Sequence, residues 1–220
     1  MAGSLDLSIG GVIVALAYAL LGDTATLPFI GALAVLALGA VFGVLPDFDI
    51  MGKMIRWKPI RFNHRHTLLH RPAFLLPLVA LCGWLFGLLS ERFLEEWFVG
   101  AWFWCIVTIL CVLWHFIHDT PPLSVGGIAW LWPFSKRYCS LKGLEESHPE
   151  PDSDWRELVR AHWLVPTYIS ELETWGASVA AGLAFGIMFR DIFLGLAVAT
   201  ACIAAVNLVW FAYERYERAH

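Results

Sequence analysis

Residues 97–120 read WFVGAWFWCIVTILCVLWHFIHDT, and this stretch decides the fold. No Lys, Arg, Asp or Glu occurs in it before Asp119. Such a run can cross the hydrocarbon core of a bilayer as one helix, which takes about 20 mostly apolar residues. Ionisable side chains enter only at its far end, as His115, His118 and Asp119. The pattern predicts a membrane span whose chemistry is confined to one end.

Similar apolar runs occur on both sides of this stretch. Hydrophobic residues make up 59% of the 220-residue chain and charged residues 15%, against about 45–50% and about 25% in soluble domains. Two of the runs, the first and the fifth, are short for a span. The composition predicts an all-α, polytopic membrane helical bundle that forms a single domain over 1–220. The six predicted spans are 7–21, 27–45, 73–89, 97–116, 175–189 and 192–211.

The basic residues favour one topology. Positively charged residues gather in the cytoplasmic loops of membrane proteins. With both termini inside, the outer loops hold only Arg92 and Arg190, and the other thirteen of the 15 basic residues lie inside. We therefore expect six spans with cytoplasmic termini, and cytoplasmic segments at 46–72 and 120–174. The net charge of -4 provides no overall basic field for nucleic acid, so we expect membrane lipids as partners instead.

The inner end of the second span carries two acids. Asp47 and Asp49 follow Pro46, and their carboxylates can converge if the chain turns there. Acids at a helix C-terminus oppose the helix macrodipole, which a bound cation would relieve. The alternative is a solvated helix end. We interpret the pair as candidate metal ligands.

The segment before the third span is dense in histidine and arginine. If a helix begins near Arg65, His66 and His70 stand four residues apart and share one helical face, as in metal sites built from two imidazoles. Arg65 and Arg71 are candidates for clamping a phosphate through their planar guanidinium groups. The alternative is a set of interfacial side chains that meet lipid headgroups.

The end of the fourth span completes the candidate site. His115 and Asp119 are four residues apart, and His118 can point into the same cleft. Ionisable groups at the end of an apolar helix predict function by default. Imidazoles and carboxylates without a thiolate suit zinc, manganese or iron, as one or two ions. Such ions polarise a phosphoryl or carbonyl oxygen and generate hydroxide from water. Glu171 and Glu173 could also close a metal shell.

Two further patterns concern contacts. Small residues spaced four apart let helix backbones approach, either within one chain or in an oligomer. They occur as Gly39/Gly43, Gly83/Gly87 and Gly182/Gly186. A second pattern is the Trp-rich run at 126–135, which could dip into the membrane interface. The five cysteines form no C-x-x-C pair, which argues against a disulfide framework or a cysteine-rich zinc knuckle.

Four motifs in order resemble a known family. Residues 45–49 (LPDFD), the His-Arg…Thr…His segment, His115-x-x-x-Asp119 and a Gly followed by residues 131–135 (LWPFS) are similar to the YdjM-like, LexA-regulated inner-membrane metal-dependent hydrolases. That family is distantly similar to zinc-dependent phospholipase C. Its members usually carry a His near the start of the first span, where this chain offers only Asp6. His70 matches the later family His, and either His64 or His66 matches the earlier one.

The residues and the resemblance together imply an enzyme. We expect a membrane-bound, metal-dependent hydrolase of a phosphoester in a lipid or lipid-linked substrate, with its site on the cytoplasmic face of the inner membrane. Metal would be held by Asp47, Asp49, His66, His70, His115, His118 and Asp119. His66 or His118 would act in proton transfer, and Arg65 and Arg71 would hold phosphate. The alternatives are a metal-ion transporter, disfavoured because the span centres hold almost no ionisable residues, and a non-catalytic membrane scaffold.

Overall fold

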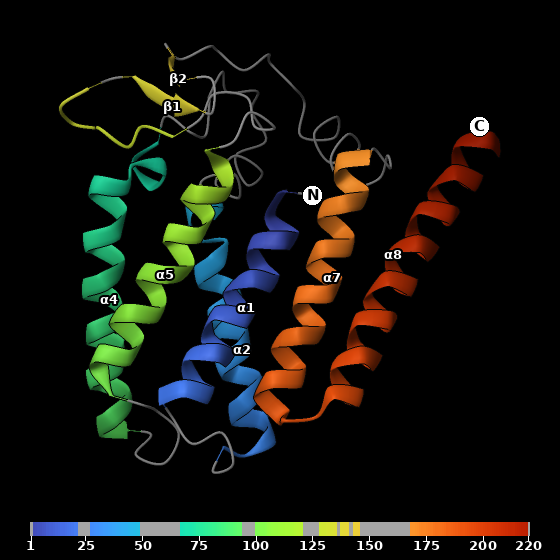
Figure 1. Cartoon of the computed structure of the whole chain (residues 1–220), viewed down its shortest axis with the longest axis horizontal. Coiled ribbons are helices and arrows are strands. Elements are labelled where there is room, and N and C mark those ends of the chain that lie inside the picture. The colour runs from blue at the N-terminus through green and yellow to red at the C-terminus, as the bar shows by residue number, and fades with distance from the viewer. Residues whose placement is uncertain are drawn as a thin grey trace. The chain divides into compact units, whose positions relative to one another are not determined.

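A computed structural model describes residues 2–21, 27–48, 67–93, 100–120, 128–135, 137–140, 143–145 and 168–219. These parts are almost entirely helical (Figure 1), which confirms the predicted all-α class. A short antiparallel hairpin, β1 (Tyr138–Ser140) and β2 (Gly143–Glu145), is the exception. The α-helices of the described residues are α1 (Ala2–Leu21), α2 (Phe29–Gly43), α4 (Pro72–Phe93), α5 (Ala101–Asp119), α7 (Tyr168–Phe189) and α8 (Ile192–Ala219).

Five of these helices are long and apolar enough to cross a membrane. The expectation that the first and fifth spans are short is wrong, because α1 has 20 residues and α7 has 22. Both helices continue through polar flanks, which include Asp6 in α1 and Glu171 in the first turn of α7. The short helix is α2, with 15 residues. Pro28 precedes it and Pro46 follows it, and proline cannot continue a helix from within.

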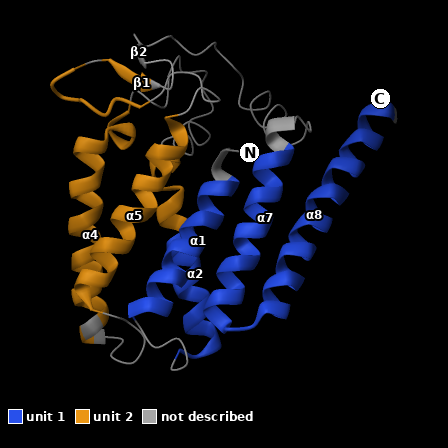
Figure 2. Cartoon of the chain, viewed as in Figure 1, with its two compact units in different colours: residues 1–40, 153–220 blue, residues 41–152 orange. Residues whose placement is uncertain are grey.

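The chain divides into two compact units (Figure 2). Unit 1 consists of Met1–Ala40 and Ser153–His220, and so contains α1, α7, α8 and most of α2. Unit 2 is Val41–Asp152, and contains α4, α5 and the hairpin. Unit 2 contains four of the candidate metal ligands that the structure describes: Asp47, His70, His115 and Asp119.

Glycines allow close helix packing in unit 1. A Cβ atom on Gly39 would lie 2.5 Å from the carbonyl oxygen of Gly10, and one on Gly182 would lie 2.5 Å from that of Gly195. The hairpin between α7 and α8 turns at Arg190, with φ of 52°, and Asp191 caps α8 by accepting hydrogen bonds from two backbone amides of its first turn. The small-residue patterns of α2 and α7 therefore serve contacts within the chain.

Glycines also allow α4 and α5 to pack closely in unit 2. A Cβ atom on Gly83 would lie 2.5 Å from Thr108 Oγ1, and one on Gly87 would overlap the backbone of Ala101. The hydroxyl of Thr108 also donates to the carbonyl of Val79 on α4, at 3.1 Å. The two helices lie side by side along their length (Figure 1). This contact fixes the end of α5 relative to the start of α4.

An apolar cluster fills unit 2 beneath these helix ends. It consists of Leu75, Val79, Val112, Phe116 and Ile128, all buried. Leu45 and Leu69 pack against it from the segments before Asp47 and His70. Close packing of these side chains, which is what drives helix association in a bilayer, holds the candidate ligand segments in place.

Candidate metal centre

Asp47 is presented by a tight turn just after α2. Residues Leu45–Asp47 form a 3₁₀ turn, η2, with Pro46 in its first positions. Leu45 packs on the apolar cluster, so the carboxylate two residues later is directed by a fixed backbone. The sequence predicts that a turn here lets acids converge, and the described residues contain such a turn. Asp49 lies outside the described residues.

His70 is carried by a second 3₁₀ turn and not by a helix. Leu68–His70 form this turn, η4, between extended residues Thr67 and Arg71. The helix that would place His66 and His70 on one face does not run through residues 67–71, because α4 begins at Pro72, close to the predicted start of the span at 73. Proline favours the first position of a helix and pushes the preceding residue toward extended geometry. The side chain of His70 is fully buried, and Thr67 Oγ1 lies 3.4 Å from its Nδ1.

His115 and Asp119 project from the last turn of α5. The two side chains are four residues apart, and His115 Nε2 lies 3.6 Å from Asp119 Oδ2. The other ring nitrogen of His115, Nδ1, is 3.1 Å from the carbonyl of Gly43. Because a carbonyl only accepts, Nδ1 carries the proton and Nε2 offers its lone pair in the neutral ring. Metal-binding histidines are oriented by this kind of backbone contact.

The three segments bring four side chains together. Asp47 Oδ1 is 3.5 Å from His70 Nε2 and 3.6 Å from His115 Nε2, and Asp119 Oδ2 is 3.8 Å from His70 Nε2. Ligand atoms of Asp47, His70 and His115 all lie within 4.8 Å of one another, so this group could hold a metal ion. The structure thus brings together four of the residues proposed from the sequence.

The spacing fits a cation better than direct hydrogen bonds. Direct N–H···O bonds measure about 2.7–3.2 Å, whereas the separations here are 3.5–3.8 Å. Ligand atoms about 2.05 Å from a tetrahedral zinc ion lie about 3.3 Å apart. These four separations are therefore close to those between neighbouring ligands of a metal ion, and Asp47, His70 and His115 are the three whose ligand atoms all lie within 4.8 Å of one another.

The charge balance of the cluster also favours a bound cation. Burial raises the pKa of Asp47, but the nearby His70 and then His115 hold its pKa below the ordinary value. Asp119 is the last residue of α5, where its charge opposes the helix macrodipole. Two carboxylates beside two buried imidazoles carry two negative charges when the rings are neutral. A divalent cation would balance that charge.

The other residues predicted for the site lie either outside the described part of the chain or outside this group. Arg65 and His66 lie outside the described residues. His118 is on α5 but is not part of the group formed by Asp47, His70 and His115. Its ring stacks on that of Trp114, with 6.1 Å between the ring centres and an interplanar angle of 9°. The metal-binding role of His118 stays a prediction.

Arg71 lies next to the cluster in sequence and is held by an unexpected partner. Its Nη2 donates to the hydroxyl of Tyr138 at 2.9 Å, and its guanidinium carbon lies 5.2 Å from the centre of the Tyr138 ring. Sequence reasoning missed Tyr138. Its aromatic character beside basic residues was visible, but a contact across 67 positions of the chain was not.

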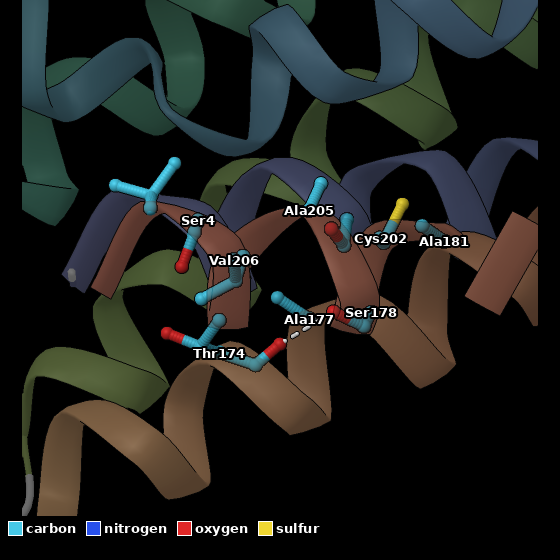
Figure 3. Close-up of a pocket in the computed structure, with 10 residues that line it drawn as sticks. Ser4, Thr174, Ala177, Ser178, Ala181, Cys202, Ala205 and Val206 are labelled. Carbon is cyan, nitrogen blue, oxygen red and sulfur yellow. Dashed lines mark hydrogen bonds between the residues drawn. The ribbon is translucent and has the colours of Figure 1, made fainter. Parts of the chain in front are cut away.

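Three further acids belong to unit 1, and the metal-binding role of Glu171 and Glu173 stays a prediction. Asp6 is buried within α1, and Glu171 and Glu173 lie in the first turns of α7. Unit 1 has its own hollow of about 390 Å³ among α1, α7 and α8 (Figure 3). Its lining consists of small, apolar and hydroxyl side chains and the thiol of Cys202, with no acid or imidazole. The lining therefore contains no cluster of ligands like that of Asp47, His70 and His115.

The fold and the cluster define a multi-pass membrane protein with a buried group of histidines and acids at the ends of its helices. A model of the YdjM inner membrane protein family matches residues 7–215, and the chain belongs to that family. It is thus a multi-pass inner membrane protein. No curated protein and no solved structure gives a significant match to the chain.

Proposed function

We propose that the protein is a membrane-bound, metal-dependent hydrolase of phosphoesters in lipid or lipid-linked substrates. The observation that carries the proposal is a set of four contacts of 3.5–3.8 Å. They join the Nε2 atoms of His70 and His115 to carboxylate oxygens of Asp47 and Asp119. When bound there, a divalent ion such as zinc polarises a phosphoryl oxygen and makes a water molecule more acidic. Manganese or iron would suit the same ligands, and a second ion would need ligands beyond these four.

The chain's own residues supply the other parts of the proposed reaction. Arg71 directly follows His70, and its Nη2 donates to Tyr138. A planar guanidinium in this position suits a phosphate, which it can bind in a bidentate manner. For proton transfer we propose His118, three residues after His115 on α5, or His66. Such transfer typically contributes about 10²–10⁴-fold to the rate.

The position of the cluster favours hydrolysis over metal-ion transport. Transporters place ion ligands near the bilayer midplane on interrupted helices. Here Asp119 is the last residue of α5, and His70 stands two residues before α4. A site at the ends of two spans is within reach of a lipid headgroup. The distribution of basic residues leads us to propose that this end faces the cytoplasm.

Elemental analysis of the purified protein tests the metal centre. We expect about one divalent ion per chain in the wild type and almost none in His70→Ala, because the substitution removes a ligand from a small buried set. Glu214→Ala is the control, since this exposed acid of α8 pairs with Arg218, and it should keep its metal. Stoichiometric metal in His70→Ala would overturn the assignment.

A substrate panel tests the reaction. Phosphomonoesters, phosphodiesters and carboxyl esters, each in lipid and soluble form, should be compared with the metal-loaded protein. We expect turnover of a phosphoester lipid that is lost in Asp119→Ala. A metal-loaded protein that cleaves none of them, and that moves the ion across vesicles, would favour the transporter. Metal without either activity would favour the scaffold.

A further inference from the structure

A segment of unit 2, residues 128–135 and 137–138, contacts both the end of α5 and the start of α4. Ile128 is fully buried in the apolar cluster, and it forms a backbone bridge to Cys139. Trp130 Nε1 donates to Thr120 Oγ1 at 3.0 Å, directly after α5. Tyr138 accepts a hydrogen bond from Arg71, directly before α4. The yellow loop that leads into β1 in Figure 1 is this segment.

These anchors fix the position of the segment relative to the ends of α4 and α5. Both α4 and α5 are long and apolar enough to be spans, and the segment is attached to the residues that immediately flank them. Whatever the segment carries is therefore presented where the hydrocarbon core gives way to headgroups. Aromatic residues concentrate at that level of membrane proteins.

Between the anchors lies an exposed apolar turn, residues 131–135. Hydrogen bonds from Trp132 N to Ala129 O, at 3.2 Å, and from Ser135 N to Leu131 O, at 3.0 Å, close it. The turn directs two large apolar side chains outward, since Phe134 is 97% exposed and Leu131 is 49% exposed. A hydrogen-bonded turn that holds a phenyl ring fully outside the protein is suited to a partner with an apolar interior.

Basic residues follow the turn directly. Arg137 is exposed, and its backbone amide is tied to the turn by a bond to Ser135 Oγ at 3.1 Å. Lys136 precedes it in the sequence. Apolar side chains beside lysine and arginine match the two layers of a leaflet, acyl chains within and anionic phosphates outside.

We propose that this apolar turn inserts into the surface of the bilayer and binds anionic phospholipid. Phe134 and Leu131 enter the acyl region, and Arg137 pairs with a headgroup phosphate. Because the turn is anchored to Arg71 through Tyr138, it also sets the level of the neighbouring metal centre relative to the headgroups. The lipid contact does not depend on whether the centre is catalytic.

Photo-crosslinking in vesicles tests the proposal. The full chain, with p-benzoylphenylalanine in place of Phe134, is reconstituted in phosphatidylethanolamine with phosphatidylglycerol and illuminated. We expect a mass increase of one phospholipid on the peptide that holds residue 134. The same photoreactive residue in place of Leu110, 42% exposed near the middle of α5, is the control that must also label lipid.

Two outcomes would overturn the proposal. One is lipid labelling at position 110 with none at 134, which would place the turn in water. The other is labelling of a second copy of the chain at 134, which would make the turn a dimer contact. The anionic preference has its own test: Arg137→Gln should lower the ratio of phosphatidylglycerol to phosphatidylethanolamine adducts about fivefold. An unchanged ratio would refute the headgroup pairing.

Discussion

At the scale of single residues, the candidate centre depends on how each imidazole is oriented. The carbonyl of Gly43 holds the proton of His115 on Nδ1 and so turns Nε2 toward Asp47 and Asp119. Groups behind a ligand commonly change metal affinity about 10–100-fold. The backbone at the end of α2 is thus as much a part of the centre as the side chains.

Tyr138 positions the guanidinium of Arg71 by accepting a hydrogen bond from it. Tyr138→Phe keeps the ring against the guanidinium but removes the oxygen that accepts from Nη2. One hydrogen bond contributes about 0.5–1.5 kcal/mol, so we expect KM for a phosphoester substrate to rise about two- to twelvefold. Steady-state kinetics would measure the change. Metal content should stay at the wild-type level, and a variant with an unchanged KM would contradict the positioning role.

At the scale of elements, glycine determines how closely α4 and α5 pack. Gly83→Ala places a Cβ atom 2.5 Å from Thr108 Oγ1 and 2.6 Å from the carbonyl of Trp104. Overpacking of this kind costs about 1–3 kcal/mol, which should lower the thermal midpoint in detergent. Gly11→Ala is the control, because its Cβ atom would meet Ala184 at 3.6 Å, an ordinary contact. Equal midpoints for the two variants would contradict this account of the helix contact.

The elements also show where sequence reasoning succeeded and where it failed. Hydropathy located the apolar runs because it is a local property of the chain. It misjudged which helix is short, because helices continue through polar flanks such as Asp6 and stop at prolines such as Pro46. It placed the start of the third span at residue 73, one position after the observed start at Pro72, whereas the 3₁₀ turn that holds His70 has no hydropathy signal.

At the scale of the whole molecule, a bound metal would tie three separate segments together. Its ligands come from η2, η4 and α5. Binding to the folded state alone stabilises a protein by about 2.7 kcal/mol when free metal is 100 times the dissociation constant. We therefore expect zinc to raise the thermal midpoint of the metal-stripped wild type. The midpoint of His70→Ala should not move, and an equal rise in both would show that zinc binds elsewhere.

Local sequence was enough for the membrane class, the helical architecture and the polar residues at helix ends. Apolar length and helical spacing act over a few neighbouring residues, so they can be read without the fold; His115 and Asp119, four residues apart, are an example. The motifs also led to the right family.

Which of the candidate ligands meet depended on the packing of distant segments. Asp47 reaches His115 across 68 positions because Leu45, Leu69 and Phe116 share one apolar cluster. The same packing leaves His118 stacked on Trp114 and brings Tyr138 to Arg71. No local pattern encodes such distances, because they result from how apolar surfaces far apart in the chain are buried against one another.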